Sequence, residues 1–220
     1  MSSPAFSEPV CNSIKCTETS RDVGALDLAE LGELLRNFGQ FISEERLLPK
    51  YAYASPGALY ATQLYLEADG IPFLRPGFHY YHPVEHRVIL ISPKPETPGA
   101  AARIRLHFVG KRRAIEPVYK NNIAEVLEIE AGHMAGLLDR VLPAYGLGLA
   151  TGTYEPATLD RLDCADEDFH LGTFEVLPLA AVRPGPPPRS TSRRTPTRSP
   201  VCPRASTGTG TVGWNGSRTR

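Results

Sequence analysis

The decisive stretch of this chain is Lys50-Tyr51-Ala52-Tyr53-Ala54-Ser55-Pro56-Gly57-Ala58-Leu59-Tyr60. It joins a lysine and several tyrosines to a Pro-Gly turn, and the alternating run 60–66 that follows predicts a strand. Gly57 has no Cβ, so the N–H groups of this turn can approach a planar or anionic ligand closely. Lys50 and Tyr53 are candidates for proton transfer beside such a ligand. The stretch is equally compatible with a basic residue and aromatic rings at the entrance of a strand.

Helical and strand patterns surround this stretch. Apolar residues at helical spacing predict a helix over residues 27–42, which begins with a capping box because Glu30 follows Asp27 by three positions. A second helix is predicted over 121–142 and is ended by Pro143. Further predicted elements are a short helix at 155–162 and strands at 60–66, 78–82, 87–91, 103–109 and 174–177.

The arrangement of these elements predicts an α+β layer fold. The turn at 83–86 is expected to join two strands as a hairpin. In the strand at 103–109, apolar residues alternate with polar ones, so one face is expected to be buried; the apolar positions are Ile104, Leu106 and Phe108 and the polar ones Arg103, Arg105 and His107.

Charge divides the chain into two parts. Its 24 basic and 24 acidic residues cancel overall, but eight arginines and no acidic residue lie in 183–220, which leaves 16 basic against 24 acidic residues in 1–182. Since phosphate binding needs a basic face, an acidic body argues against a nucleic-acid partner. With 41% hydrophobic residues, the body has enough apolar side chains for a core.

The composition divides the chain into three segments. Residues 1–18 are expected to be an irregular lead-in, 19–182 the folded domain, and 183–220 a disordered tail rich in Arg, Pro, Ser, Thr and Gly. A second interpretation of the tail stays open, because translation of a GC-rich gene in a shifted frame gives the same composition.

Cysteine and histidine positions predict no metal site. The four cysteines lack the double pairing of zinc ligands, and free thiols favour a reducing cytoplasm; they are Cys11, Cys16, Cys164 and Cys202. His82 and His86 flank Pro83, which excludes a regular helix between them. Glu130 and His133 are expected to be a polar pair in the core. No secretion signal or membrane-spanning run is expected.

Ordered motifs give the chain a family resemblance over residues 19–182. The Ser-x-Gly-Ala-Leu-Tyr turn at 55–60, Glu-Ala-Gly-His at 130–133 and Gly-Leu-Gly at 146–148 resemble SagB-type dehydrogenases of the nitroreductase superfamily, which bind FMN. Residues 48–66 and 115–122 are similar to the oxidation domain of indigoidine synthase-type nonribosomal peptide synthetases. The resemblance implies a nitroreductase-like fold, with a central mixed or antiparallel sheet flanked by helices, and a homodimer.

The resemblance also implies which residues contact FMN. Ser55, Gly57, Ala58 and Leu59 match the loop beside the flavin, and Gly146 and Gly148 match a second glycine segment on the flavin side. Arg21 matches the last position of an Arg-x-Ser-x-Arg phosphate signature, in which Thr17 replaces the first arginine. The residues themselves leave other interpretations open: a solvated arginine, and an ordinary passage from helix to loop at the glycines.

For catalysis the resemblance implies Lys50 and Tyr53, with Tyr119 and Lys120 as a second candidate pair that is also compatible with an ordinary helix entry. The expected reaction is Cα–Cβ dehydrogenation of an aminoacyl group, glutaminyl in type, held on a carrier protein and supplied by adenylation and thiolation modules. Two alternatives stay open: a nicotinamide-dependent flavin reductase and an inactive relic.

Overall fold

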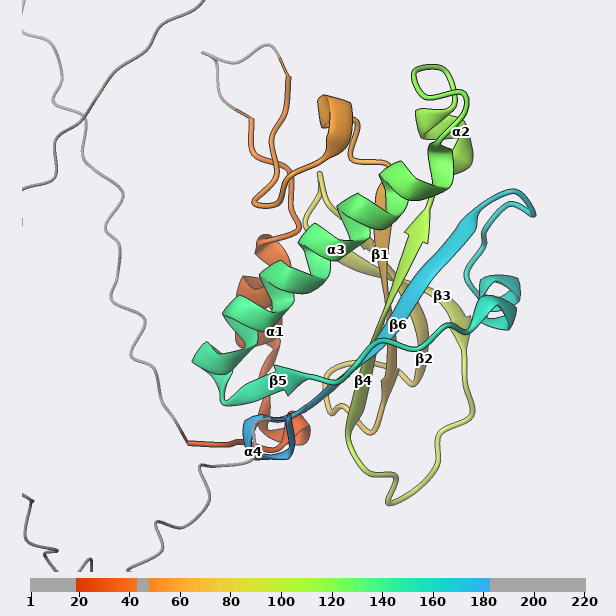
Figure 1. Cartoon of the computed structure of the whole chain (residues 1–220). Coiled ribbons are helices and arrows are strands. Elements are labelled where there is room, and N and C mark those ends of the chain that lie inside the picture. The colour runs from red at the N-terminus through yellow and green to blue at the C-terminus, as the bar shows by residue number, and fades with distance from the viewer. Residues whose placement is uncertain (1–18, 43–47, 183–220) are drawn as a thin grey trace, which may run out of the picture. The chain divides into compact units, whose positions relative to one another are not determined.

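The computed structural model describes residues 19–42 and 48–182 (Figure 1). The predicted lead-in, the predicted tail and Thr17 lie outside the described residues, so the expectations placed on them stay predictions. Within the described part, no helix combines the length and apolar character that a membrane span needs.

A six-stranded sheet forms the centre of the fold, in the order β3-β2-β1-β4-β6-β5. Every neighbouring pair is antiparallel, so of the two predicted sheet types the antiparallel one is correct. The predicted hairpin at 83–86 is confirmed, because it joins β2 to β3. The strands are β1 (Thr62–Asp69), β2 (Gly77–His82), β3 (Arg87–Pro93), β4 (Arg103–Gly110), β5 (Leu147–Leu149) and β6 (Phe169–Pro178).

Helices α1 (Leu28–Arg36) and α3 (Ile123–Val141) cover one face of this sheet. The predicted capping box starts α1, since the Asp27 carboxylate accepts from the Glu30 N–H at 2.8 Å and Glu30 accepts from the Asp27 N–H at 3.0 Å. The helices are α1 (Leu28–Arg36), α2 (Arg112–Ile115), α3 (Ile123–Val141) and α4 (Leu179–Val182), with 3-10 turns η1 (Val23–Ala25), η2 (Pro56–Ala58), η3 (Leu142–Tyr145) and η4 (Pro156–Arg161).

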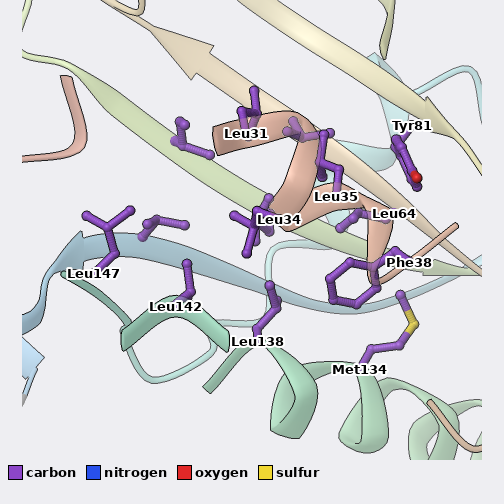
Figure 2. Close-up of a cluster of buried hydrophobic side chains, with 14 of the residues drawn as sticks. Leu31, Leu34, Leu35, Phe38, Leu64, Tyr81, Met134, Leu138, Leu142 and Leu147 are labelled. Atoms are coloured by element: carbon purple, nitrogen blue, oxygen red, sulfur yellow. The ribbon is translucent and has the colours of Figure 1, made fainter. Parts of the chain in front are cut away.

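The main core lies between α1, α3 and the sheet (Figure 2). Leu31, Leu34 and Leu35 of α1 are buried there, together with Met134 and Leu138 of α3. Each large apolar side chain that is fully removed from water stabilises the fold by about 1.5–3 kcal/mol, so this interface fixes α3 on the sheet.

Several predicted boundaries are wrong. The first helix ends at Arg36 rather than 42, and Ile42, assigned to its apolar stripe, is 80% exposed. The first strand begins at Thr62 because Tyr60 has a φ of +50°, which no strand residue adopts. The second helix begins at Ile123, and the short helix at 155–162 is a 3-10 turn. The pattern missed β5 and the first half of β6.

The second face of the sheet carries buried charge, which corrects the one-face prediction for β4. Glu67 of β1 pairs with Lys94 and with Arg105, at 3.0 Å for the latter. His107, expected on the solvent side, is fully buried, and its Nδ1 lies 2.8 Å from the Thr173 hydroxyl. The same hydroxyl lies 2.9 Å from Nε2 of His170. Buried polar groups need such partners, so this network fixes β1, β4 and β6 relative to one another.

We predict that this network makes the fold acid-sensitive. Burial, and after it the neighbouring His107, lower the pKa of His170 from 6.5 to about 4, while Glu155 acts in the opposite direction. Between these values the unfolded chain binds a proton that the folded chain does not, so stability falls as pH drops from about 6.5 towards 4. Hydrogen bonds and ion pairs of Glu67 outweigh its burial and lower its pKa, so its contribution is lost at still lower pH.

The measurement is the melting temperature by circular dichroism between pH 7.5 and 4.5. His170→Gln should flatten the pH dependence, and His82→Gln, at the half-exposed end of β2, should leave it unchanged. An identical slope in wild type and His170→Gln would contradict the assignment.

Candidate functional site

The turn at residues 55–60 is held in a strained conformation. Gly57, Ala58 and Tyr60 all have positive φ, of 64°, 54° and 50°. Left-handed backbone costs about 1–3 kcal/mol for each non-glycine residue and persists only where surrounding contacts impose it. Ser55 supplies two of these contacts, because its hydroxyl accepts from the Tyr60 N–H at 2.9 Å and its carbonyl from the Ala58 N–H at 3.0 Å.

Tyr119 covers this turn. A Cβ built on Gly57 would lie 3.2 Å from the Tyr119 hydroxyl oxygen, so a larger residue there would make the Tyr119 side chain shift by a few tenths of an ångström. Leu59 and Tyr119 pack on the same small apolar cluster, which contains Ile115. The structure therefore brings together Tyr119 and the turn, two candidates that lie 62 positions apart in sequence. Lys120, the other member of that predicted pair, is exposed.

Tyrosines gather beside the turn. The ring centroids of Tyr51 and Tyr60 are 4.1 Å apart, and both lie 5.7 Å from that of Tyr53. Tyr53 is buried, and burial, with the charge of Glu130 next, raises its pKa. At neutral pH Tyr53 is therefore a protonated phenol, which can donate a hydrogen bond or a proton but does not act as a base.

Lys50 lies at the entrance of this tyrosine stretch. Its N–H donates to the Phe41 carbonyl at 3.0 Å, and its own carbonyl accepts from the Phe41 N–H at 2.7 Å. This isolated bridge ties residue 50 to the segment that follows α1. The residue as a whole is half-buried.

Glu130 is the site residue whose role the sequence did not reveal. Its Oε2 accepts from the Thr62 N–H at 2.8 Å and from the Thr62 hydroxyl at 2.7 Å, while its Oε1 is buried with no partner among the described residues. The predicted core pair is wrong, because His133 is exposed and its Nδ1 lies 3.1 Å from the Ala54 carbonyl oxygen. The sequence signal was an acidic residue on the apolar face of a helix.

The remaining predicted cofactor residues form a second group. Arg21, Gly146 and Glu30 line a cavity of about 280 Å³ with Thr19, Ser20, Ala144 and Tyr145. The Arg21 guanidinium lies 2.5 Å from the Glu30 carboxylate, and this bond holds the pKa of Glu30 below its usual range. Gly146 has a φ of +71°, and its carbonyl accepts from the Arg21 N–H at 3.0 Å. Gly148 lies in β5, against Val182.

The two groups lie at different positions along α3. The turn at 55–60 (orange in Figure 1) packs beside its N-terminal half, and Gly146 follows its C-terminal end. At about 1.5 Å per residue, the 19 residues of α3 extend over about 28 Å. One copy of the chain thus presents the predicted ring contacts and the predicted phosphate contacts far apart.

No three His, Cys, Asp or Glu side chains of residues 19–42 and 48–182 are arranged to hold a metal ion. Cys164 is a half-buried free thiol.

Comparison with known proteins gives two related sequences and, separately, solved structures of the same fold. The chain is 61% identical over 164 residues to the indigoidine synthase of Streptomyces lavendulae and 54% identical over 165 residues to that of Dickeya dadantii (strain 3937). These matches cover 74% and 73% of the chain, and the chain spans only 13% and 11% of the length of the two relatives. No protein-family model matches the chain.

Solved structures with the same fold include a putative nitroreductase from Ralstonia eutropha JMP134, with a TM-score of 0.55 and 16% identity over 69% of this chain and 72% of that one. The McbBCD microcin synthetase complex of E. coli, with truncated pro-MccB17 bound, has a TM-score of 0.56 and 14% identity over 80% of this chain and 76% of that one. This chain is a nitroreductase-fold homologue of a segment of indigoidine synthases. The predicted nitroreductase-like fold is confirmed.

Two regions of the described chain differ in how well they fit FMN. The turn at residues 55–60 fits the ring of FMN, because its small residues lie under Tyr119 and beside a tyrosine cluster. The phosphate region fits poorly within one chain, because Glu30 already neutralises Arg21.

We predict that Gly57→Val disrupts the turn by displacing Tyr119. Gly99→Val is the matched control, since Gly99 has a similar φ of +74° but open space around it. Both variants should lose about 1–2 kcal/mol of stability from backbone strain, and only Gly57→Val should also lose bound flavin, read from the absorbance spectrum after gel filtration. Stoichiometric flavin in a folded Gly57→Val protein would refute this placement.

Proposed function

We propose that the chain is an FMN-dependent oxidoreductase that dehydrogenates the Cα–Cβ bond of a carrier-bound aminoacyl group, glutaminyl in type, in the biosynthesis of an indigoidine-type pigment. The observation that carries the proposal is the 54–61% identity with a segment of two indigoidine synthases. The other segments of such proteins, including adenylation and thiolation modules, are the proposed partners. A cytoplasmic location belongs to the proposal as well.

The chemistry divides between cofactor and protein. FMN, when bound, supplies the acceptor for the hydride that leaves the β-carbon, and dioxygen regenerates it. The protein must remove the α-proton and hold the substrate. Lys50 is the proposed base, and Tyr53 the proposed hydrogen-bond donor to the thioester carbonyl, because its raised pKa keeps its proton in place. Ser55, Gly57, Ala58 and Leu59 would lie beside the ring.

Tyr119 and Lys120 remain the second candidate pair. In their favour, the Tyr119 hydroxyl lies directly over Gly57 of the turn. Against them, Lys120 is exposed, whereas Lys50 is half-buried.

The experiment that tests the function is anaerobic stopped-flow bleaching of the flavin by a carrier-bound glutaminyl thioester. Lys50→Ala and Tyr53→Phe should retain FMN and slow the bleaching by roughly 10²–10⁴-fold, the usual scale of a general acid or base. Tyr154→Phe is the control, because Tyr154 is 74% exposed. Wild-type rates in both variants, with losses in Tyr119→Phe and Lys120→Ala, would transfer the role to the second pair.

The cofactor itself is tested first. Purified protein should be yellow, and it should not be bleached rapidly by NADH alone. Bleaching by NADH, with turnover of a nitroaromatic compound and none of the thioester, would replace the proposal with a flavin reductase. A colourless protein that cannot be reconstituted with FMN would indicate an inactive relic.

A homodimer is part of the proposal, because it can supply the phosphate contacts and ring contacts of one FMN from two copies. The outward surface of α3 suits this: Gly132 and Gly136 are exposed with open space around them, and Ile129 beside them is 54% exposed.

We predict that Gly136→Arg produces a folded monomer with weakened FMN retention, whereas wild type is a dimer by light scattering. Ala157→Arg, exposed on η4, is the control and should remain dimeric. A wild-type monomer that retains FMN would contradict the dimer.

A further inference from the structure

A cavity of about 120 Å³ lies beside the tyrosine cluster. Five of its lining residues are tyrosines, and none of its lining residues is basic; the lining consists of Phe38, Tyr51, Tyr53, Tyr60, Thr62, Gln63, Leu64, Tyr80, Tyr81, Pro83 and Met134. Phe38 and Met134 lie next to each other at this end of the core (Figure 2). The half-buried rings of Tyr51, Tyr60 and Tyr80 leave the cavity partly open.

The cavity lies where the pairing of β1 with β2 ends. The β1–β2 ladder runs from Ala68↔Gly77 to Tyr65↔Tyr80, and beyond it residues 62–64 of β1 pair with β4. The space that opens between β1 and β2 at this end is bordered by Leu64 and Tyr81, and the tyrosines of the turn segment cover it. The hollow is therefore produced by the backbone of the fold rather than by one side chain.

A buried carboxylate lies behind the lining of this cavity, next to two of the lining residues. Glu130 is 1% exposed, and its Oε1 has no hydrogen-bond partner among the described residues. Thr62, which binds its other oxygen, and Met134, one helical turn further along α3, both line the cavity. Burial is the main cause that raises the pKa of Tyr51 and Tyr53, and the charge of Glu130 adds to it in both cases, so its field reaches the lining rings.

This combination favours one class of ligand. The faces of aromatic rings attract cations, and a carboxylate oxygen without a partner attracts a charged donor strongly. Burial raises the pKa of Tyr51, Tyr53, Tyr80 and Tyr81, so their phenols stay neutral and add no competing charge. The volume equals that of roughly four waters, which suits a small organic cation and excludes a flavin ring system.

We infer that this tyrosine cavity binds the α-ammonium group of the aminoacyl substrate, which the carboxylate of Glu130 attracts from behind the lining. The inference rests on the proposed function, because that function supplies the substrate. An ammonium group held here would lie close to Tyr53 and beside the turn at 55–60. Glu130 is then a positioning residue, which holds the α-carbon in place for proton removal.

Calorimetric titration of the full chain tests the inference without any turnover. The probes are L-glutamine methyl ester, which carries the ammonium group, and N-acetyl-L-glutamine methyl ester, which lacks it. The first should bind wild-type protein at least tenfold more tightly. Its advantage should disappear as pH rises through the amine pKa of about 7.7–8.0, with no change for the acetylated probe. Equal affinities of wild type for the two probes would overturn the inference.

The variants are Glu130→Gln and Glu128→Gln. Glu128 is exposed on the same helix, so its substitution removes an equal charge and should leave the tenfold preference intact. Glu130→Gln keeps the shape of the side chain and should reduce the preference to within about twofold. An unchanged preference in a folded Glu130→Gln protein would overturn the inference. If that variant does not fold, the comparison of probes on wild type decides.

The inference and the proposed function fail in different ways. Selective binding of the ammonium probe without flavin bleaching by the carrier-bound thioester would support the cavity assignment and refute the oxidation reaction. Equal bleaching rates with glutaminyl and N-acetylglutaminyl thioesters would retain the reaction and refute the cavity assignment.

Discussion

One buried carboxylate connects helix α3 to strand β1. Oε2 of Glu130 accepts both the N–H and the hydroxyl hydrogen of Thr62, which joins the middle of α3 to the first residue of β1. A charged group buried away from water is costly unless hydrogen bonds compensate it, so this contact defines the position of the helix over the sheet. The turn at 55–60 lies between the two elements, and its geometry depends on that position.

The strain in the turn follows from the same constraint. The chain must pass from the segment beside α1 into β1 within a few residues, under Tyr119 and against α3. Positive φ at Gly57, Ala58 and Tyr60 achieves this reversal, and Ser55 compensates part of its cost with two hydrogen bonds. Alanine and tyrosine in such a conformation indicate that the ring stacking and the turn stabilise each other.

Local patterns predicted the elements better than their contacts. The capping box at Asp27, the apolar stripe of α3 and the hairpin at 83–86 are signals within a few residues, and all three are present in the structure. The contact of Glu130 with Thr62 joins residues 68 positions apart, and no local pattern encodes such a distance. Burial of His107 was missed for the same reason, because alternation along one strand says nothing about the network that covers its second face.

The sequence predicted candidate residues for the site, but not the ion pairs and hydrogen bonds that they make. The motif order proposed the turn and the Gly146 segment as parts of the site, but it did not indicate that Arg21 pairs with Glu30, nine residues away. Glu30 and Glu130 therefore differ in the partners of their carboxylates. Glu30 is neutralised by a guanidinium, whereas Glu130 has only the neutral donors of Thr62 on one oxygen. The fold thus leaves the unpartnered oxygen of Glu130 near the tyrosine cavity, where a cationic group of a ligand meets no competing side-chain cation among the residues that line it.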